Sequence, residues 1–188
     1  MRATLRLALR WGLPWGAGLA TVGVIALGVV AIGAFDTTAS TPHPPLIAWA
    51  THATMINFVR REARRRPPPP RFTAGDVAEG ARLYDANCAM CHGGPGVARA
   101  AWTAGMTPAP PYLLDAARQF DANELYVLVR HGVKMTGMPS WEQTLSPHDV
   151  WQVVAFLRAL PSYSAADYAQ FRGGGAAAMK RLAPAKSS

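Results

Sequence analysis

The pentapeptide Cys88-Ala89-Met90-Cys91-His92 constrains the fold of this chain more than any other feature. Two cysteines separated by two residues and followed directly by histidine form the attachment motif of c-type haem. One helical turn places both sulfurs along one porphyrin edge, where each thiol bonds a vinyl-derived carbon, and the histidine stands under the iron. We therefore expect one covalent haem c, held by both cysteines and by His92.

Other uses of the cysteine pair fit the sequence less well. A structural zinc site needs four closed ligands, and the motif offers three. Thioredoxin-like chemistry expects a βαβ context, which this sequence lacks. The chain has two cysteines in total, so a long-range disulfide framework within it is excluded.

Electron transfer through haem needs a second axial ligand, and a thioether in that place raises the reduction potential and blocks small molecules. Four methionines follow the motif, and we expect Met138 to be the ligand, because it lies before Pro139 in a loop between two predicted helices. Met135 in the same loop is the alternative. Met106, in a proline-rich stretch, and Met179, in the C-terminal tail, are weaker candidates.

Two further histidines of this region, His131 and His148, are also candidate iron ligands. Ligation by two histidines would lower the potential. His131 falls at a predicted helix C-terminus, where a cation is favoured, so iron is not needed to explain it. The expected metal ligands therefore remain His92 and Met138.

The N-terminal region contains a long apolar segment, since residues 11–35 hold no charged side chain. A membrane helix needs about 20 apolar residues, whereas the apolar region of a signal peptide has about 7–15. We therefore predict a transmembrane anchor over 11–35. A cleaved leader is the alternative, which the small residues Ala31, Gly33 and Ala39 would allow.

The charges around this segment predict its orientation. Residues 1–10 carry three arginines and no acid, while the first basic residue after the segment is Arg60. That residue lies beyond the roughly 15–20 positions over which flanking charge counts. We expect a cytoplasmic N-terminus, a single pass through a bacterial inner membrane, and a haem domain in the periplasm.

The net charge of +8 belongs mainly to the N-terminal third of the chain. Residues 71–188 hold eleven basic and nine acidic side chains, so the region with the haem motif is nearly neutral. A nucleic-acid-binding module needs a basic face on its folded part. We therefore expect no nucleic acid among the partners.

Residues 36–71 predict an amphipathic helix followed by a stiff linker. Pro44 and Pro45 suit a helix start, and four consecutive prolines from Pro67 end the segment as a polyproline spacer. Five arginines near the helix end are suited to anionic headgroups or an acidic partner, and equally to a solvated helix end. The apolar face comprises Leu46, Trp49, Ala50, Ala53, Ile56 and Val59.

Residues 72–171 have the pattern of a small helical domain. Stop residues stand at Gly132 and Pro161, and no strand pattern occurs. After this domain, residues 172–188 predict a disordered tail of Gly, Ala, Lys and Ser. Four helix starts carry an acidic residue three positions after a capping residue: Thr73 with Asp76, Asp121 with Glu124, Ser146 with Asp149, and Ser164 with Asp167.

Residues 75–84 are followed by three residues and then by the CAMCH motif. This arrangement resembles the opening of class I cytochromes c. The TGMP-S-W loop resembles membrane-anchored, mono-haem bacterial members. In that family a glycine and an aromatic residue of the first helix pack against the last helix. The matching residues are Gly80 and Tyr84, which would face Val153 and Phe156, and glycine lets two helix backbones approach closely.

The resemblance also concerns the histidine ligand. In the broader family a proline carbonyl accepts a hydrogen bond from the second ring nitrogen of that histidine. Three prolines are available here, Pro108, Pro110 and Pro111, and Pro111 is the best match because it stands two residues before Leu113.

The resemblance implies an all-α fold, a class I cytochrome c domain with an N-terminal transmembrane helix. It implies an electron-transfer protein, not an enzyme, which carries single electrons between a membrane-associated redox donor and acceptor. The first alternative is a permanent haem subunit of a larger dehydrogenase or oxidase complex. The second is an enzyme or gas sensor with an open iron site, against which the two loop methionines argue.

Overall fold

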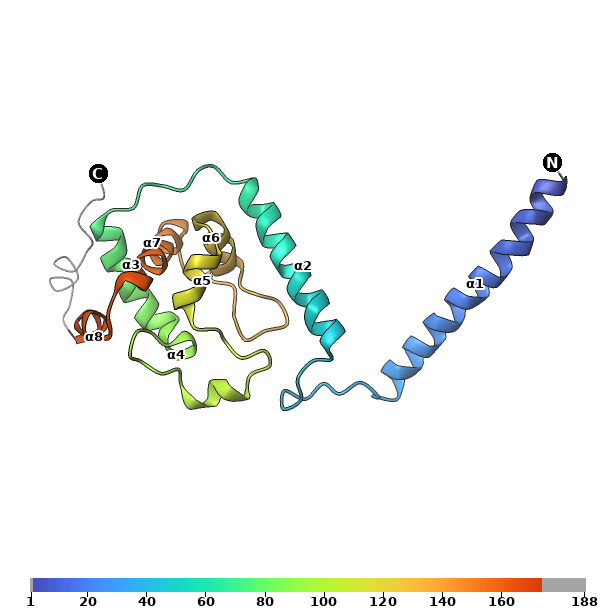
Figure 1. Ribbon diagram of the computed structural model, residues 1–188, viewed down its shortest axis with the longest axis horizontal. Coiled ribbons are helices and arrows are strands. Elements are labelled where there is room, and N and C mark those ends of the chain that lie inside the picture. The colour runs from blue at the N-terminus through green and yellow to red at the C-terminus, as the bar shows by residue number, and fades with distance from the viewer. Residues whose placement is uncertain (1, 174–188) are drawn as a thin grey trace. The chain divides into compact units, whose positions relative to one another are not determined.

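The computed structural model describes residues 2–173 (Figure 1). Contacts divide the chain into two units, 1–41 and 42–188. Within the described residues all regular structure is helical, apart from one isolated bridge between Gly94 and Val97. The predicted all-α class is therefore confirmed, whereas the predicted tail beyond residue 173, including Met179, lies outside the described residues.

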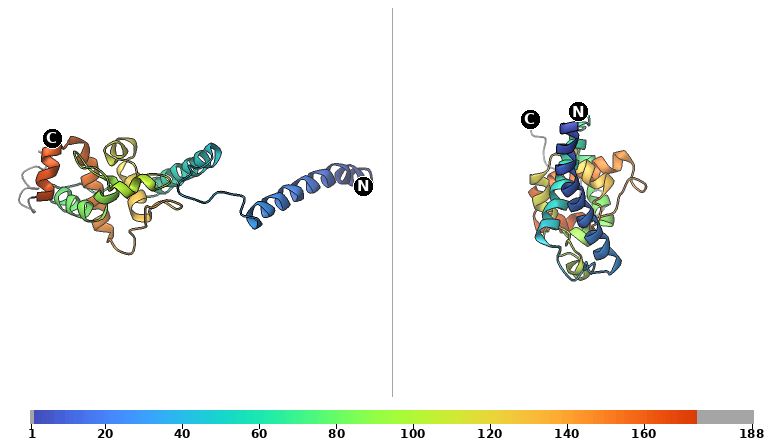
Figure 2. Two further views of the ribbon diagram at one scale, coloured as in Figure 1. Left: turned by 90° about the horizontal axis from the view of Figure 1, so that it is seen from below. Right: turned by 90° about the vertical axis from the view of Figure 1, so that its right-hand side faces the viewer.

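The first unit contains α1 (Arg2–Ala31), one continuous helix in each view (Figure 2). Gly33 follows two residues after its end, and its φ of 65° lets the N–H groups of Gly33 and Ala34 bond the last helical carbonyls. No helix among the described residues combines the length and the apolar character that a membrane crossing needs. The structure thus gives no support to the predicted anchor over 11–35.

The core of the second unit is the crossing of α3 (Ala74–Asn87) with α7 (Pro147–Ala159). A Cβ added at Gly80 would overlap the carbonyl oxygen of Gln152, so glycine is what permits this approach. Next to the crossing, the rings of Tyr84 and Phe156 lie 5.2 Å apart and both are fully buried. The predicted contact of Tyr84 with Phe156 is confirmed, and a Cβ added at Gly80 would also meet the Cβ of Phe156, at 3.0 Å.

All four predicted helix starts are present. Capping boxes begin α3, α6 (Ala122–His131) and α7, and in each the first residue and the acidic residue bond reciprocally. Ser164 and Asp167 make the same pair of bonds at the start of α8 (Ala165–Gly173). Each cap satisfies backbone N–H groups that lack a partner in the first helical turn. The predicted stop at Gly132 is also confirmed, with φ of 65°.

Three short elements had no counterpart in the sequence-based prediction, because they are too short to show a helical repeat of apolar residues. They are α5 (Leu113–Gln119) and the 3₁₀ turns η1 (Ala101–Gly105) and η2 (Leu160–Ser162). The single turn of α4 (Ala89–His92), in contrast, is the helical turn that the attachment motif predicted.

The predicted amphipathic helix is α2 (Pro45–Arg64), and its C-terminal half packs against α6. Val59 and Ala63 are buried there. The N-terminal half extends past its shorter neighbour, so Leu46 and Trp49 of the predicted apolar face remain 73% and 67% exposed. The apolar face is therefore only partly used within this unit.

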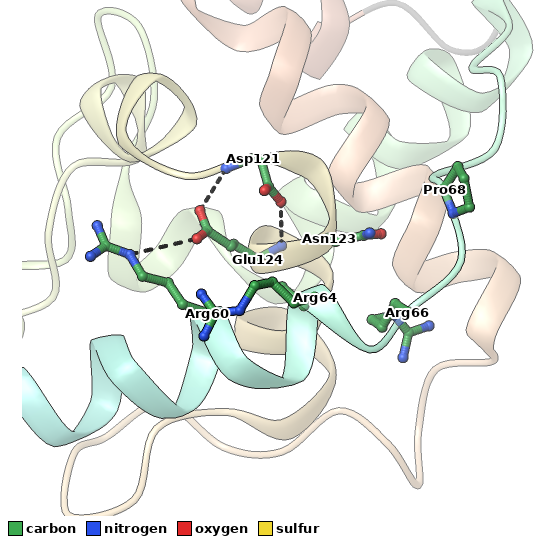
Figure 3. A pocket seen from close by; sticks show the side chains of 8 residues that line it. Arg60, Arg64, Arg66, Pro68, Asp121, Asn123 and Glu124 are labelled. Atoms are coloured by element: carbon green, nitrogen blue, oxygen red, sulfur yellow. Dashed lines mark hydrogen bonds and ion pairs between the residues drawn. The ribbon is translucent and has the colours of Figure 1, made fainter.

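Arginines fasten the end of α2 to the domain. Arg60 pairs with Glu124 at 3.7 Å beside a polar cleft of about 440 Å³ (Figure 3). Arg66 stacks on the ring of Tyr126, with 3.8 Å between the guanidinium carbon and the ring centroid. Part of the basic cluster is thus a structural contact with α6.

Candidate haem site

The attachment motif begins where α3 ends. Cys88 caps α3, with its N–H bonded to the carbonyl of Tyr84 at 2.8 Å, and the single turn of α4 follows. The N–H of His92 donates to the carbonyl of Cys88 at 2.9 Å, which closes this turn. Both cysteines are free thiols and half-buried. The geometry therefore presents two free sulfurs and an imidazole from one helical turn.

The environment of Cys88 disfavours thiolate chemistry at that residue. Burial raises the pKa of the Cys88 thiol to about 12, with a smaller contribution from Cys91. A thiol that stays protonated is a weak metal ligand and a weak nucleophile. No group of three or more His, Cys, Asp or Glu side chains suited to a metal ion occurs among the described residues.

The ring of His92 is oriented by the backbone. Its Nδ1 lies 2.8 Å from the carbonyl oxygen of Pro111. A carbonyl only accepts, so Nδ1 carries the proton and Nε2 keeps its lone pair. Burial lowers the pKa of His92, and Arg99 lowers it further, while the bond to Pro111 opposes both. The expected hydrogen bond to Pro111 is confirmed. Because burial lowers the pKa of His92, the imidazole is neutral, and the Nε2 lone pair is available to a metal.

Gly93 links this histidine to the core. Its φ is 65°, and an added Cβ would contact the ring of Tyr112 at 3.2 Å. Its carbonyl accepts a hydrogen bond from the buried hydroxyl of Tyr84 at 2.7 Å. The residue after His92 is thus held by the same aromatic side chain that packs at the α3–α7 crossing.

The loop that carries the candidate methionines joins α6 to α7, as predicted. Met138 is half-buried, its N–H donates to Thr136 Oγ1 at 3.1 Å, and its carbonyl accepts from the N–H of Val133 at 3.2 Å. Met135 has a positive φ of 62° and is 69% exposed. The two methionines thus differ in burial and backbone support, and ligation by Met138 stays a prediction.

A third methionine contacts the same loop. The half-buried side chain of Met106 reaches Gly137, since an added Cβ there would overlap its methyl group. At the end of the loop, Ser140 Oγ and the N–H of Trp141 both donate to the carbonyl of Arg130, at 3.0 and 3.1 Å. The loop is therefore tied to the α6 end and supported from the segment that follows the motif.

The other histidines have partners of their own. His131 lies 3.5 Å from Glu142, and His148 Nε2 lies 3.1 Å from the side-chain amide of Gln152. Both interactions are exposed and lie outside the contacts described around His92. They account for these side chains without iron.

Two side chains near His92 were not singled out from the sequence. Arg99 donates to the carbonyl of Pro110 and stacks on Tyr112. Neither side chain was assigned a role from the sequence, because their contact is visible only in the folded turn.

The residues of this site fit a covalent haem. Two free thiols stand one turn apart, and a neutral imidazole beside them has its Nε2 lone pair available. A protein family model agrees with this fit: residues 75–157 match the family described as "Cytochrome C oxidase, cbb3-type, subunit III". No curated protein matches the chain. The matched segment runs from α3 through most of α7, and it includes the motif, Pro111 and the methionine loop.

Proposed function

Residues 75–157 form a class I c-type cytochrome domain, which implies electron transfer, and from this premise we propose that the chain is a mono-haem carrier of single electrons between membrane-associated redox proteins. The observation that carries the proposal is the orientation of His92. Its Nδ1–H is bonded to Pro111, so Nε2 is the atom available to iron.

The proposed residue roles follow from the site. Cys88 and Cys91 would hold the haem through thioether bonds, and His92 and Met138 would be its two axial ligands. When bound, haem supplies a centre that gains and loses one electron. The chain's own residues orient the imidazole, keep water from the core and set the polarity around the site. Electron transfer needs no side chain that acts as an acid, base or nucleophile.

Membrane attachment is the second part of the proposal. It rests on the sequence, in which residues 11–35 carry no charge and three arginines precede them. The haem domain would then lie in the periplasm of a bacterial inner membrane. A carrier held at the membrane surface meets its redox partners in two dimensions.

The alternative is a haem subunit fixed in a larger complex, and the matched family favours it. That family is described as a subunit of a cytochrome oxidase. A mobile carrier should be recovered alone after mild detergent extraction from native membranes. A fixed subunit should copurify with the same proteins in a constant ratio.

Removal of the thiols tests the haem assignment. Replacing both Cys88 and Cys91 with serine should abolish haem that survives denaturation, because both thioether bonds are lost. Haem staining of the denatured protein measures this, with each single variant expected to retain weakened attachment at most. Normal covalent haem in the double variant would contradict the proposed function.

A further inference from the structure

The turn after the motif brings the chain back toward His92. Gly94 and Val97 exchange two backbone hydrogen bonds, of 3.0 and 2.9 Å. The N–H of Ala100 then donates to the carbonyl of Met90 at 3.0 Å, inside the attachment motif. Arg99 is consequently placed beside the histidine, although it lies seven positions further along the sequence.

The Arg99 side chain contacts both neighbours of Pro111. Its Nη1 donates to the carbonyl of Pro110, and its guanidinium carbon lies 4.3 Å from the centroid of the Tyr112 ring. Pro111 lies between them, and its carbonyl accepts the hydrogen bond from Nδ1–H of His92. The Arg99 guanidinium therefore contacts the residue before and the residue after Pro111, the hydrogen-bond acceptor.

The segment has few other ways to be held. Pro110 and Pro111 have no backbone N–H, so neither can donate a hydrogen bond to the rest of the fold. A planar guanidinium supplies such donors in a fixed geometry and also stacks on aromatic rings. Arg99 thus supplies a hydrogen-bond donor to this segment, in which the two successive prolines have none.

We propose that Arg99 is a positioning residue, which holds the Pro111 carbonyl against His92 and thereby sets the electron donation of His92 to the bound iron. The inference rests on the proposed haem function and deepens it. A hydrogen bond from the second ring nitrogen makes a metal-bound imidazole more basic. A weaker hydrogen bond between His92 and the Pro111 carbonyl should therefore favour iron(II) and raise the reduction potential.

The charge of Arg99 acts in the opposite direction. A cation near iron disfavours the more positive iron(III) state, so removing the charge alone should lower the potential. Arg99→Lys separates the two effects, because it keeps the charge and loses the fixed fork and the planar stacking surface. Arg99→Gln removes the charge as well. Tyr112→Leu removes the stacked ring, and Tyr112→Phe is its matched control.

The test uses the haem-loaded full-length protein in detergent. One measurement is the reduction potential, and the other is hydrogen exchange of the His92 Nδ1–H, followed by NMR in the reduced form. Arg99→Lys and Tyr112→Leu should speed exchange by about two- to tenfold, the worth of one net hydrogen bond, and should raise the potential. Tyr112→Phe should match the wild type, and Arg99→Gln should speed exchange as Arg99→Lys does.

The outcomes that would overturn the inference are distinct from those that test the haem assignment. Haem-loaded Arg99→Lys and Tyr112→Leu proteins with unchanged exchange and potential overturn the role of Arg99 and leave the haem function standing. A lowered potential in Arg99→Gln alone, without faster exchange, overturns it too, because charge then explains the whole effect. A wild type without covalent haem overturns both.

Discussion

His92 and Met138 differ in how firmly the chain holds them. His92 stands on a helical turn, its ring is bonded to Pro111, and the next residue is bonded to the buried hydroxyl of Tyr84. Met138 stands in an irregular loop, where two bonds fix its backbone. The histidine is thus pre-oriented by the fold, whereas the methionine depends on its loop.

Substitution of the loop methionines tests the choice of ligand. Met138→Ala should leave haem attached, remove the weak near-infrared methionine-to-iron band of the oxidised protein, and lower the reduction potential, because a thioether disfavours iron(III). Carbon monoxide should then bind quickly to the reduced form. Met135→Ala is the matched control and should change none of these, because its side chain is exposed. The opposite pattern would make Met135 the ligand.

Tyr84→Phe tests the connection from the core to the motif. The change removes the hydroxyl that donates to Gly93 and leaves a buried carbonyl without its partner, while the ring contact with Phe156 remains. The free energy of unfolding should fall by about 1–3 kcal/mol. Denaturant titration of the haem-loaded protein measures this, with the slope of the transition unchanged. An unchanged midpoint would show that the bond contributes nothing net.

Single residues also show what the sequence could and could not reveal. Pro111 was chosen among three prolines by resemblance and spacing, and the bond to His92 confirms it. Arg99 and Tyr112 were missed because their contact depends on a turn that returns the chain through Gly94 and Val97. Such a contact has no local pattern of spacing or periodicity.

Among the elements, those with a local cap were predictable and those without one were not. Each capping box that begins α3, α6 or α7 consists of four consecutive residues, so its residue types can be recognised in the sequence. The short α5 has neither such a box nor enough turns to show an apolar repeat. The face of α2 was predicted from periodicity, but periodicity cannot tell how far the neighbouring helix extends.

The α3–α7 crossing gives a prediction with an internal control. Gly80→Ala places a methyl group into the carbonyl of Gln152, so the two helices must separate, and stability should fall by about 1–3 kcal/mol. Gly75→Ala, in the first turn of α3, adds a methyl only 3.5 Å from Thr73 Oγ1, an ordinary contact. It should be neutral or stabilise the protein by up to about 1 kcal/mol.

Thermal and denaturant unfolding of both variants decide this. Equal effects of the two substitutions would mean that helix propensity, and not the close approach at Gly80, governs the result. The comparison is informative because both glycines lie in the same helix and receive the same added group.

For the whole molecule, the distribution of charge and burial separates the parts. Residues 1–35 carry only basic charge, while residues 71–188 are nearly neutral. All buried hydrophobic side chains among the described residues lie between Val59 and Phe171. The helical domain therefore has a core of its own, and α2 adds Val59 and Ala63 to it.

Removal of the N-terminal segment tests the proposed anchor. Full-length protein should sediment with membranes and resist extraction by high salt, because an apolar segment and not surface charge would hold it. Replacing residues 1–35 with a cleavable leader should give a soluble, haem-loaded protein, since the buried side chains among the described residues all follow residue 58. Cell fractionation with haem staining measures both. Recovery of the full-length gene product in the soluble periplasmic fraction, with an N-terminus beyond residue 34, would show instead that the segment is a leader removed during export.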